Sequence, residues 1–191
     1  MSSLLAVTVI MLVAAITPGP NNLVVLRAAA RGGARAAIPA IAGIVTGGLV
    51  LLGIVVAGGG AVFAMEPGLR LSVTFGGCTY LSWLGLRLIR GAGSPSVHSA
   101  QPEGALALFG FQFLNPKAWM MVLTTTAAAP DLAIWQLAAV FVIVPVACLT
   151  VWAAGGAALT GFLARPTAAA RFDHAMGALL VVSAIGLALN A

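Results

Sequence analysis

The stretch that decides the fold is a helix break inside an apolar run, and it reads Thr17-Pro18-Gly19-Pro20-Asn21-Asn22. Pro18 and Pro20 lack the N–H groups that would bond the carbonyls of Ala14 and Ile16 in a continuous helix. Such carbonyls are costly in lipid, so the break must line protein or a wet cavity. A new helix begins after it, and a helix N-terminus attracts a carboxylate or another anion. The alternative is a proline kink that neighbouring helices satisfy.

A second break of the same kind lies in the other half of the chain, and it reads Gln112-Phe113-Leu114-Asn115-Pro116-Lys117. Pro116 frees the carbonyl of Gln112, and Asn115 can cap the helix that follows. Lys117 falls deep in an apolar run, where a lysine costs about 2.5 to 3.5 kcal/mol. We therefore expect it to face the interior. Its ammonium could attract a substrate carboxylate, pair with carbonyls of the first break, or carry a proton.

The whole composition indicates a membrane protein. Of the 191 residues, 61% are hydrophobic and 7% are charged, which is too few polar groups to cover a soluble domain. A membrane-spanning helix needs about 20 apolar residues. Six segments qualify, at roughly 4–26, 38–64, 70–89, 104–128, 133–160 and 173–190.

The basic residues predict an orientation. Seven of the nine Lys and Arg residues fall in the loops after the first, third and fifth segments, namely Arg27, Arg31, Arg35, Arg87, Arg90, Arg165 and Arg171. Loops rich in these residues stay in the cytoplasm. We therefore predict that both termini are periplasmic. In a membrane chain the net charge of +5 indicates topology, and no nucleic-acid partner is predicted.

The polar linker at 91–103 divides the chain into two groups of three helices. Because three is odd, two homologous halves would be inverted in the membrane. Pro18 and Pro116 are 98 residues apart, and Gly85 and Gly186 are 101 apart within a matching pattern. We predict an all-α membrane protein of six transmembrane helices arranged as two inverted three-helix repeats. Repeat one covers about 1–90 and repeat two about 104–191, in a single transporter domain.

The two breaks occupy corresponding places in the two halves, which is typical of a transporter binding site. A substrate carboxylate would meet the helix N-termini and Lys117, and an amino group would meet carbonyls near Ala14, Ile16 and Gln112. No catalytic set, metal site or cofactor is predicted. The predicted substrate-binding residues are Pro18, Gly19, Pro20, Asn21, Asn22, Gln112, Asn115, Pro116 and Lys117.

Charged residues outside the breaks suggest ordinary roles. Arg27, Arg31 and Arg35 recur every four residues, which predicts a basic helix face that anchors to anionic headgroups. Asp173 begins the last predicted span, where an aspartate commonly caps a helix.

These motifs, in this order, resemble the lysine exporter / homoserine-threonine exporter family. The resemblance rests on residues 17–21, Arg31-Gly32-Gly33-Ala34-Arg35, residues 42–47, the 76–85 segment and the Asn115-Pro116-Lys117 string. It covers nearly the whole chain, and the Thr-Pro-Gly-Pro-Asn-Asn string is most similar to the cysteine/O-acetylserine exporter group. The resemblance implies six helices in the bacterial inner membrane and amino acid efflux driven by the proton gradient.

The chain departs from the family at its acidic residues. Many members carry one in the second helix, near the position of Gly48, and often another in the fifth, whereas none of the six spans has a carboxylate in its predicted core here. This disfavours a carboxylate proton relay and a cationic substrate. A small neutral amino acid fits better.

Two other classes compete with a transporter. A membrane thiol-disulfide carrier would need cysteines beside the breaks, whereas Cys78 and Cys148 lie in the third and fifth spans. A non-transporting membrane partner or assembly protein would need no cavity between the breaks. A homo-oligomer is compatible with all three classes.

Overall fold

The computed structural model describes residues 3–92 and 104–189, and these residues form helices and no strand. Of the predicted linker at 91–103, residues 93–103 lie outside this part. In chain order the elements are α1 (Ser3–Ile16), α2 (Pro20–Gly32), the 3-10 turn η1 (Ala34–Ala37), α3 (Ile38–Ile54), the π-helical turn η2 (Val55–Gly59), α4 (Gly60–Met65), α5 (Pro67–Arg90), α6 (Ala105–Leu114), α7 (Pro116–Ala128), α8 (Ile134–Ala158), α9 (Thr160–Leu163) and α10 (Pro166–Leu189).

Helices lie in all six predicted spans, but they are not equally apolar. Among the described residues, three are long and apolar enough to cross a membrane: Ala34–Met65, Ile134–Ala158 and Pro166–Leu189. The pair α1 and α2 becomes a fourth if a bent pair counts as one span. The predicted span 70–89 lies within α5, which also carries Arg87 and Arg90, and 104–128 is divided between two short helices. Six crossings therefore remain a prediction.

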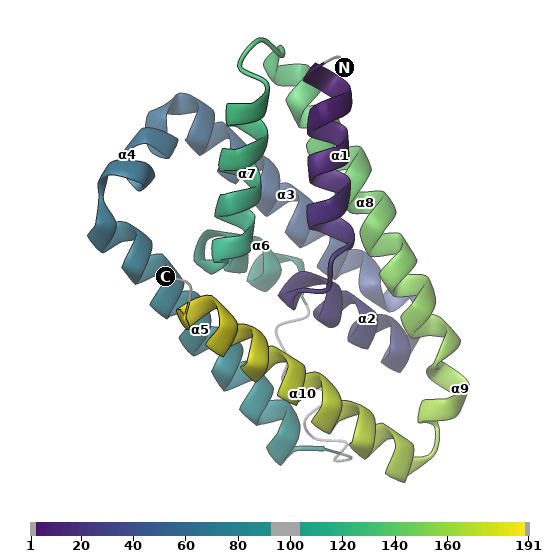
Figure 1. Ribbon diagram of the computed structural model, residues 1–191. Coiled ribbons are helices and arrows are strands. Elements are labelled where there is room, and N and C mark those ends of the chain that lie inside the picture. Colours follow the sequence, from purple (N-terminus) through teal and green to yellow (C-terminus); the bar gives the residue numbers. More distant parts are fainter. Residues whose placement is uncertain (1–2, 93–103, 190–191) are drawn as a thin grey trace.

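Both predicted helix breaks are confirmed. α1 ends at Ile16 and α2 begins at Pro20, with a bend of 57° between them (Figure 1). α6 ends at Leu114 and α7 begins at Pro116. Both new helices begin on a proline, whose missing N–H costs nothing in the first turn. The prolines thus end one helix and start the next within a few residues.

A third helix interruption lies in the span 38–64, which the sequence predicts as one unbroken segment. Gly58 has φ of +105°, a conformation that only glycine adopts readily. The helix is interrupted there, and α4 follows as a short final segment (Figure 1). Phe63 of α4 stacks on Trp119 of α7 with ring centroids 4.2 Å apart, which fixes this segment against the second break.

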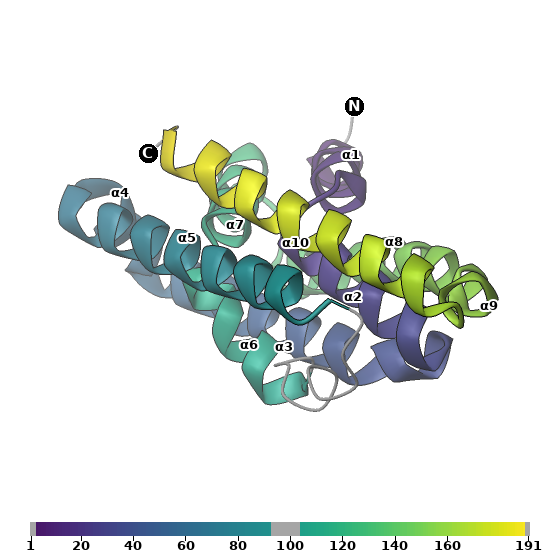
Figure 2. The ribbon, with the colours of Figure 1, turned by 90° about the horizontal axis from the view of Figure 1, so that it is seen from below.

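α5 and α10 run side by side in opposite directions (Figures 1 and 2). Gly85 and Gly177 face each other, and a Cβ at Gly85 would lie 2.6 Å from the Gly177 carbonyl oxygen. Cys78 of α5 adds a hydrogen bond between the same two helices, because its Sγ donates to the Ala184 carbonyl of α10 at 3.2 Å. Small residues permit this close antiparallel packing.

Candidate functional site

A small pocket lies where the two helix breaks meet, with a cavity volume of about 40 Å³. α1 and α2 contribute one wall, α7 a second, and α3 and α8 the rest. The lining residues are Ala14, Ala15, Gly19, Pro20, Asn21, Asn22, Ile44, Asn115, Lys117, Ala118, Met121, Pro145 and Leu149. The polar groups come from the breaks and the apolar walls from the surrounding helices.

Side chains satisfy the carbonyls that the first break leaves without helical partners. The amide nitrogen of Asn22 donates to the carbonyls of Ala15 at 3.0 Å and Thr17 at 2.9 Å. Trp152 Nε1 donates to the carbonyl of Ile16 at 3.2 Å. These bonds make the break a defined structure rather than a loose kink, because each replaces a lost backbone bond.

Lys117 connects the second break to the first. Its Nζ donates to the carbonyl oxygen of Thr17 at 2.8 Å. The sequence allows this ammonium to pair with carbonyls of the first break, and the structure shows that pairing. The lysine lies directly over Gly19, where a Cβ would come 3.0 Å from Nζ. Gly19 thus leaves the room that the lysine needs.

Asn21 and Gln112 form a reciprocal amide pair between the two breaks. Asn21 Nδ2 donates to Gln112 Oε1 at 2.9 Å, and Gln112 Nε2 donates back to Asn21 Oδ1 at 3.2 Å. Gln112 is also held by the carbonyl of Leu108 at 2.9 Å and is 1% exposed. Gln112 therefore supports the site through Asn21.

Asn115 caps α7. Its Oδ1 accepts from the backbone N–H of Lys117 at 3.1 Å, and its carbonyl accepts from Ala118 at 2.9 Å. Asn115 and Lys117 at the start of α7 line the pocket, as do the residues at the start of α2, so the positive ends of both helices border it. Two helix N-termini therefore border one small space.

The structure brings most of the predicted site residues together. Six of them line the pocket: Gly19, Pro20, Asn21, Asn22, Asn115 and Lys117. The other three, Pro18, Gln112 and Pro116, are outside the lining, although each lies within or beside a break.

Sequence reasoning missed the apolar walls. Ile44, Met121 and Leu149 come from three different helices, and no local pattern separates them from the other apolar residues of those helices. Pro145 could have been predicted as a lining residue, because a proline inside a long membrane helix frees a backbone carbonyl that must face protein or a cavity rather than lipid.

The expected acceptors for an amino group are partly occupied. The carbonyl of Ile16 already accepts from Trp152, and that of Gln112 accepts from the Asn115 N–H at 3.3 Å. Ala14 lines the pocket.

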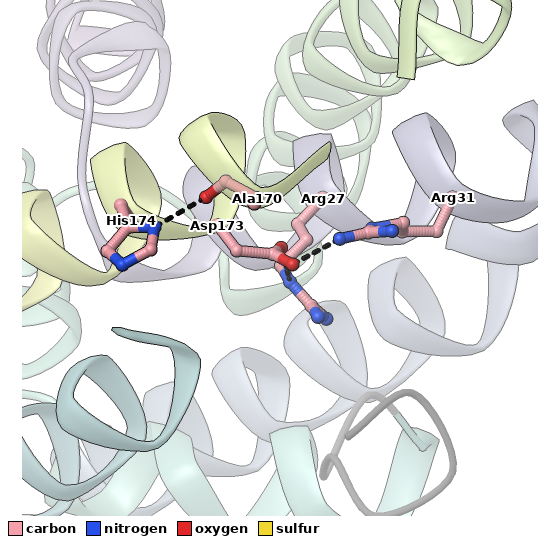
Figure 3. Close-up of polar contacts among 5 residues, drawn as sticks. All are labelled: Arg27, Arg31, Ala170, Asp173 and His174. Atoms are coloured by element: carbon pink, nitrogen blue, oxygen red, sulfur yellow. Dashed lines mark hydrogen bonds and ion pairs between the residues drawn. The ribbon is translucent and has the colours of Figure 1, made fainter. Parts of the chain in front are cut away.

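A buried ion cluster joins α2 to α10 (Figure 3). Arg27 Nε lies 3.3 Å from Asp173 Oδ1, and Arg31 Nη2 bonds the other carboxylate oxygen. Asp173 is 2% exposed and Arg27 is 4% exposed. The neighbouring His174 turns away and contacts the carbonyl of Ala170 at 2.7 Å.

This cluster corrects two expectations. Asp173 is not a helix cap, because α10 begins at Pro166 and places it two turns inside an apolar helix. A carboxylate therefore does lie within a candidate span. Arg27 is not a headgroup anchor, since it is buried against that carboxylate.

Comparison with known proteins gives a family match over most of the chain. The family model described as LysE type translocator matches residues 12–191. A cysteine/O-acetylserine efflux protein of Salmonella choleraesuis is 30% identical over 106 residues, covering 56% of this chain and 54% of the relative. A threonine efflux protein of Escherichia coli K12 is 31% identical over 123 residues, covering 60% of each chain. The matched part thus spans little more than half the length of these relatives. No solved structure matches the chain.

Proposed function

We propose a transport function from one premise: the chain belongs to the LysE type translocator family. The function is secondary export of a small neutral amino acid or derivative, of the cysteine, O-acetylserine, homoserine or threonine type, across the bacterial inner membrane. The similarity to a cysteine/O-acetylserine efflux protein and a threonine efflux protein supports efflux of such compounds. The proton gradient is the proposed driving force.

The observation that carries the proposal is the pocket between two helix N-termini. A substrate carboxylate would lie near the first turns of α2 and α7, with the Lys117 ammonium beside it. Backbone N–H groups at helix N-termini bind anions, and a lysine adds a full charge. The proposed substrate-binding residues are those of the two breaks, with Pro18, Gln112 and Pro116 in supporting positions.

The charge of the pocket lining favours a neutral amino acid. Lys117 is the one charged residue among the described residues that line it. A basic amino acid would bring a second ammonium with no carboxylate beside it, which is costly in a site of low dielectric. Asp173 does not supply one, because two arginines already hold it outside this lining.

The proposed architecture is six spans in two inverted repeats, about 1–90 and 104–191, with both termini periplasmic. The antiparallel packing of α5 on α10 and the similar breaks at α1/α2 and α6/α7 support it. The pocket between the breaks disfavours a partner protein without a cavity. A thiol-disulfide carrier is disfavoured because neither Cys78 nor Cys148 lines the pocket.

Amino acid efflux from dipeptide-loaded cells tests the function. Cells that express the protein and vector controls would be loaded with dipeptides of threonine, serine or lysine, and release of the free amino acid followed over time. We expect faster efflux of a neutral amino acid and no change for lysine. Efflux of lysine raised as much as that of threonine would contradict the charge argument, and no increase for any amino acid would contradict export itself.

A further inference from the structure

An α-amino acid carries a carboxylate and an ammonium, and the positive groups at the two helix breaks can bind only the carboxylate. The helix N-termini and Lys117 suit the carboxylate. The ammonium needs an acceptor, yet the lining contains no Asp or Glu, and the carbonyls of Ile16 and Gln112 already accept bonds. Two kinds of neutral acceptor in the lining can take this role, the backbone carbonyl of Ala14 and a side-chain amide oxygen.

Asn22 has the required geometry. Its side chain is 4% exposed and lines the pocket. Its amide nitrogen is committed to the carbonyls of Ala15 and Thr17. An amide has two hydrogens, so these two bonds use both and fix the orientation of the group. What Asn22 can still offer is Oδ1, an acceptor.

Asn115 offers the opposite group at the other break. It is 2% exposed and lines the same pocket. Its Oδ1 accepts from the backbone N–H of Lys117, which again fixes the orientation of the amide. What remains is the Nδ2 group, a donor of two hydrogens.

Asn21 is less available than either residue. Both ends of its amide are engaged with Gln112, at 2.9 Å and 3.2 Å. Of the two neighbouring asparagines, only Asn22 has an amide end that makes no hydrogen bond within the protein.

We infer that Asn22 and Asn115 are the specificity-determining pair of this pocket: Asn22 Oδ1 accepts from the substrate α-ammonium, and Asn115 Nδ2 donates to its carboxylate. This inference rests on the proposed function and defines the substrate class as zwitterionic α-amino acids. Compounds that lack either charge bind less well.

Ligand binding to the purified full-length protein in detergent tests the inference. The probes are L-threonine, its α-hydroxy counterpart 2,3-dihydroxybutyrate, and 1-aminopropan-2-ol, which lacks the carboxylate. O-Acetyl-L-serine and its α-hydroxy counterpart form a second pair. The wild-type protein should bind each amino acid at least about tenfold more tightly than its α-hydroxy counterpart, because a hydrogen bond to a charged group is lost.

Asn22→Ala should weaken threonine binding about tenfold or more and change dihydroxybutyrate binding less than about threefold, since that ligand has no ammonium. Asn115→Asp keeps the cap oxygen but replaces the donor by a carboxylate, so it should weaken dihydroxybutyrate binding most, because that ligand has no ammonium to offset the repulsion. Gln136→Ala is the control, because it removes a side-chain amide that lies outside the pocket lining. It should leave the ratio between the two ligands unchanged.

Equal losses for both ligands in Asn22→Ala, or unchanged binding in Asn115→Asp, would overturn the assignment while leaving export in place. If Asn22→Ala does not fold, two measurements still test the inference. They are the ratio of threonine to dihydroxybutyrate affinity in the wild-type protein and the effect of Asn115→Asp on ligand binding. A folded wild-type protein that neither binds nor exports any amino acid would overturn the proposed function, and this inference with it.

Discussion

The ammonium nitrogen of Lys117 lies 2.8 Å from the carbonyl oxygen of Thr17, so the two helix breaks are bonded directly to each other across 100 residues of sequence. One cation thereby satisfies a carbonyl of the first break and contributes the positive charge of the pocket. Changes at this contact should affect both the shape and the charge of the site.

Lys117→Met should lower export of a neutral amino acid at least about tenfold. The substitution keeps most of the side-chain volume but removes a hydrogen bond to a charged group, which contributes about 1.5 to 3 kcal/mol. Efflux from dipeptide-loaded cells measures it. Arg70→Met is the control, because Arg70 is exposed and outside the pocket lining. Equal efflux from Lys117→Met and the control would contradict a role for the lysine.

Gly19→Ala should reduce export by a similar factor without a large loss of stability. The added Cβ would lie 3.0 Å from Nζ and 3.3 Å from Cδ of Lys117, so the flexible lysine moves away from Thr17. Gly48→Ala is the matched control, since a Cβ there has no neighbour within 4 Å. Thermal unfolding of both variants separates a displaced side chain from a misfolded protein. Normal export by Gly19→Ala would show that this contact is dispensable.

Two adjacent glycines of α8 should respond differently to alanine. A Cβ at Gly156 would lie 2.1 Å from the carbonyl oxygen of Leu26 in α2, whereas one at Gly155 would make an ordinary 3.7 Å contact. Gly156→Ala should therefore cost about 1 to 3 kcal/mol of unfolding free energy through overpacking. Gly155→Ala should be neutral or stabilising, because alanine favours a helix. Thermal unfolding in detergent compares them, and similar midpoints would argue against this close helix contact.

The Asp173 cluster predicts an asymmetry between its members. Asp173→Asn leaves the buried guanidinium of Arg27 and the partly buried one of Arg31 without their carboxylate and should cost about 3 to 5 kcal/mol. Arg31→Met leaves Arg27 with Asp173, a neutral pair, and should cost clearly less. Unfolding midpoints and the amount of folded protein in the membrane measure both, with His174→Asn as the neighbouring exposed control. Equal losses for Asp173→Asn and Arg31→Met would contradict the charge balance proposed for this cluster.

The sequence predicted the helix breaks well because their causes are local. A proline lacks its N–H wherever it lies, so residues 17–22 and 112–117 could be read without knowing the rest of the fold. The pairing of the two breaks followed from their similar positions in the two halves. Their direct contact through Asn21 and Gln112 adds the geometry that the sequence lacked.

The ion cluster could not be predicted because its cause is not local. Arg27 and Asp173 are separated by 146 residues, and each alone has an ordinary explanation at a helix end. Hydropathy also placed the start of the last helix at 173, because residues 166–172 include polar and charged side chains. The proline at 166 was the better signal, since prolines are favoured at the first position of a helix.

The ion cluster also has a consequence for biosynthesis. The ribosome completes α2 long before it reaches Asp173, which lies in the last helix of the chain. Until α10 emerges, Arg27 and Arg31 lack this carboxylate and must stay hydrated or among lipid headgroups. Final docking of α2 therefore waits for the end of translation. A chain that stalls before Asp173 would retain two cations on α2 without the carboxylate that neutralises them.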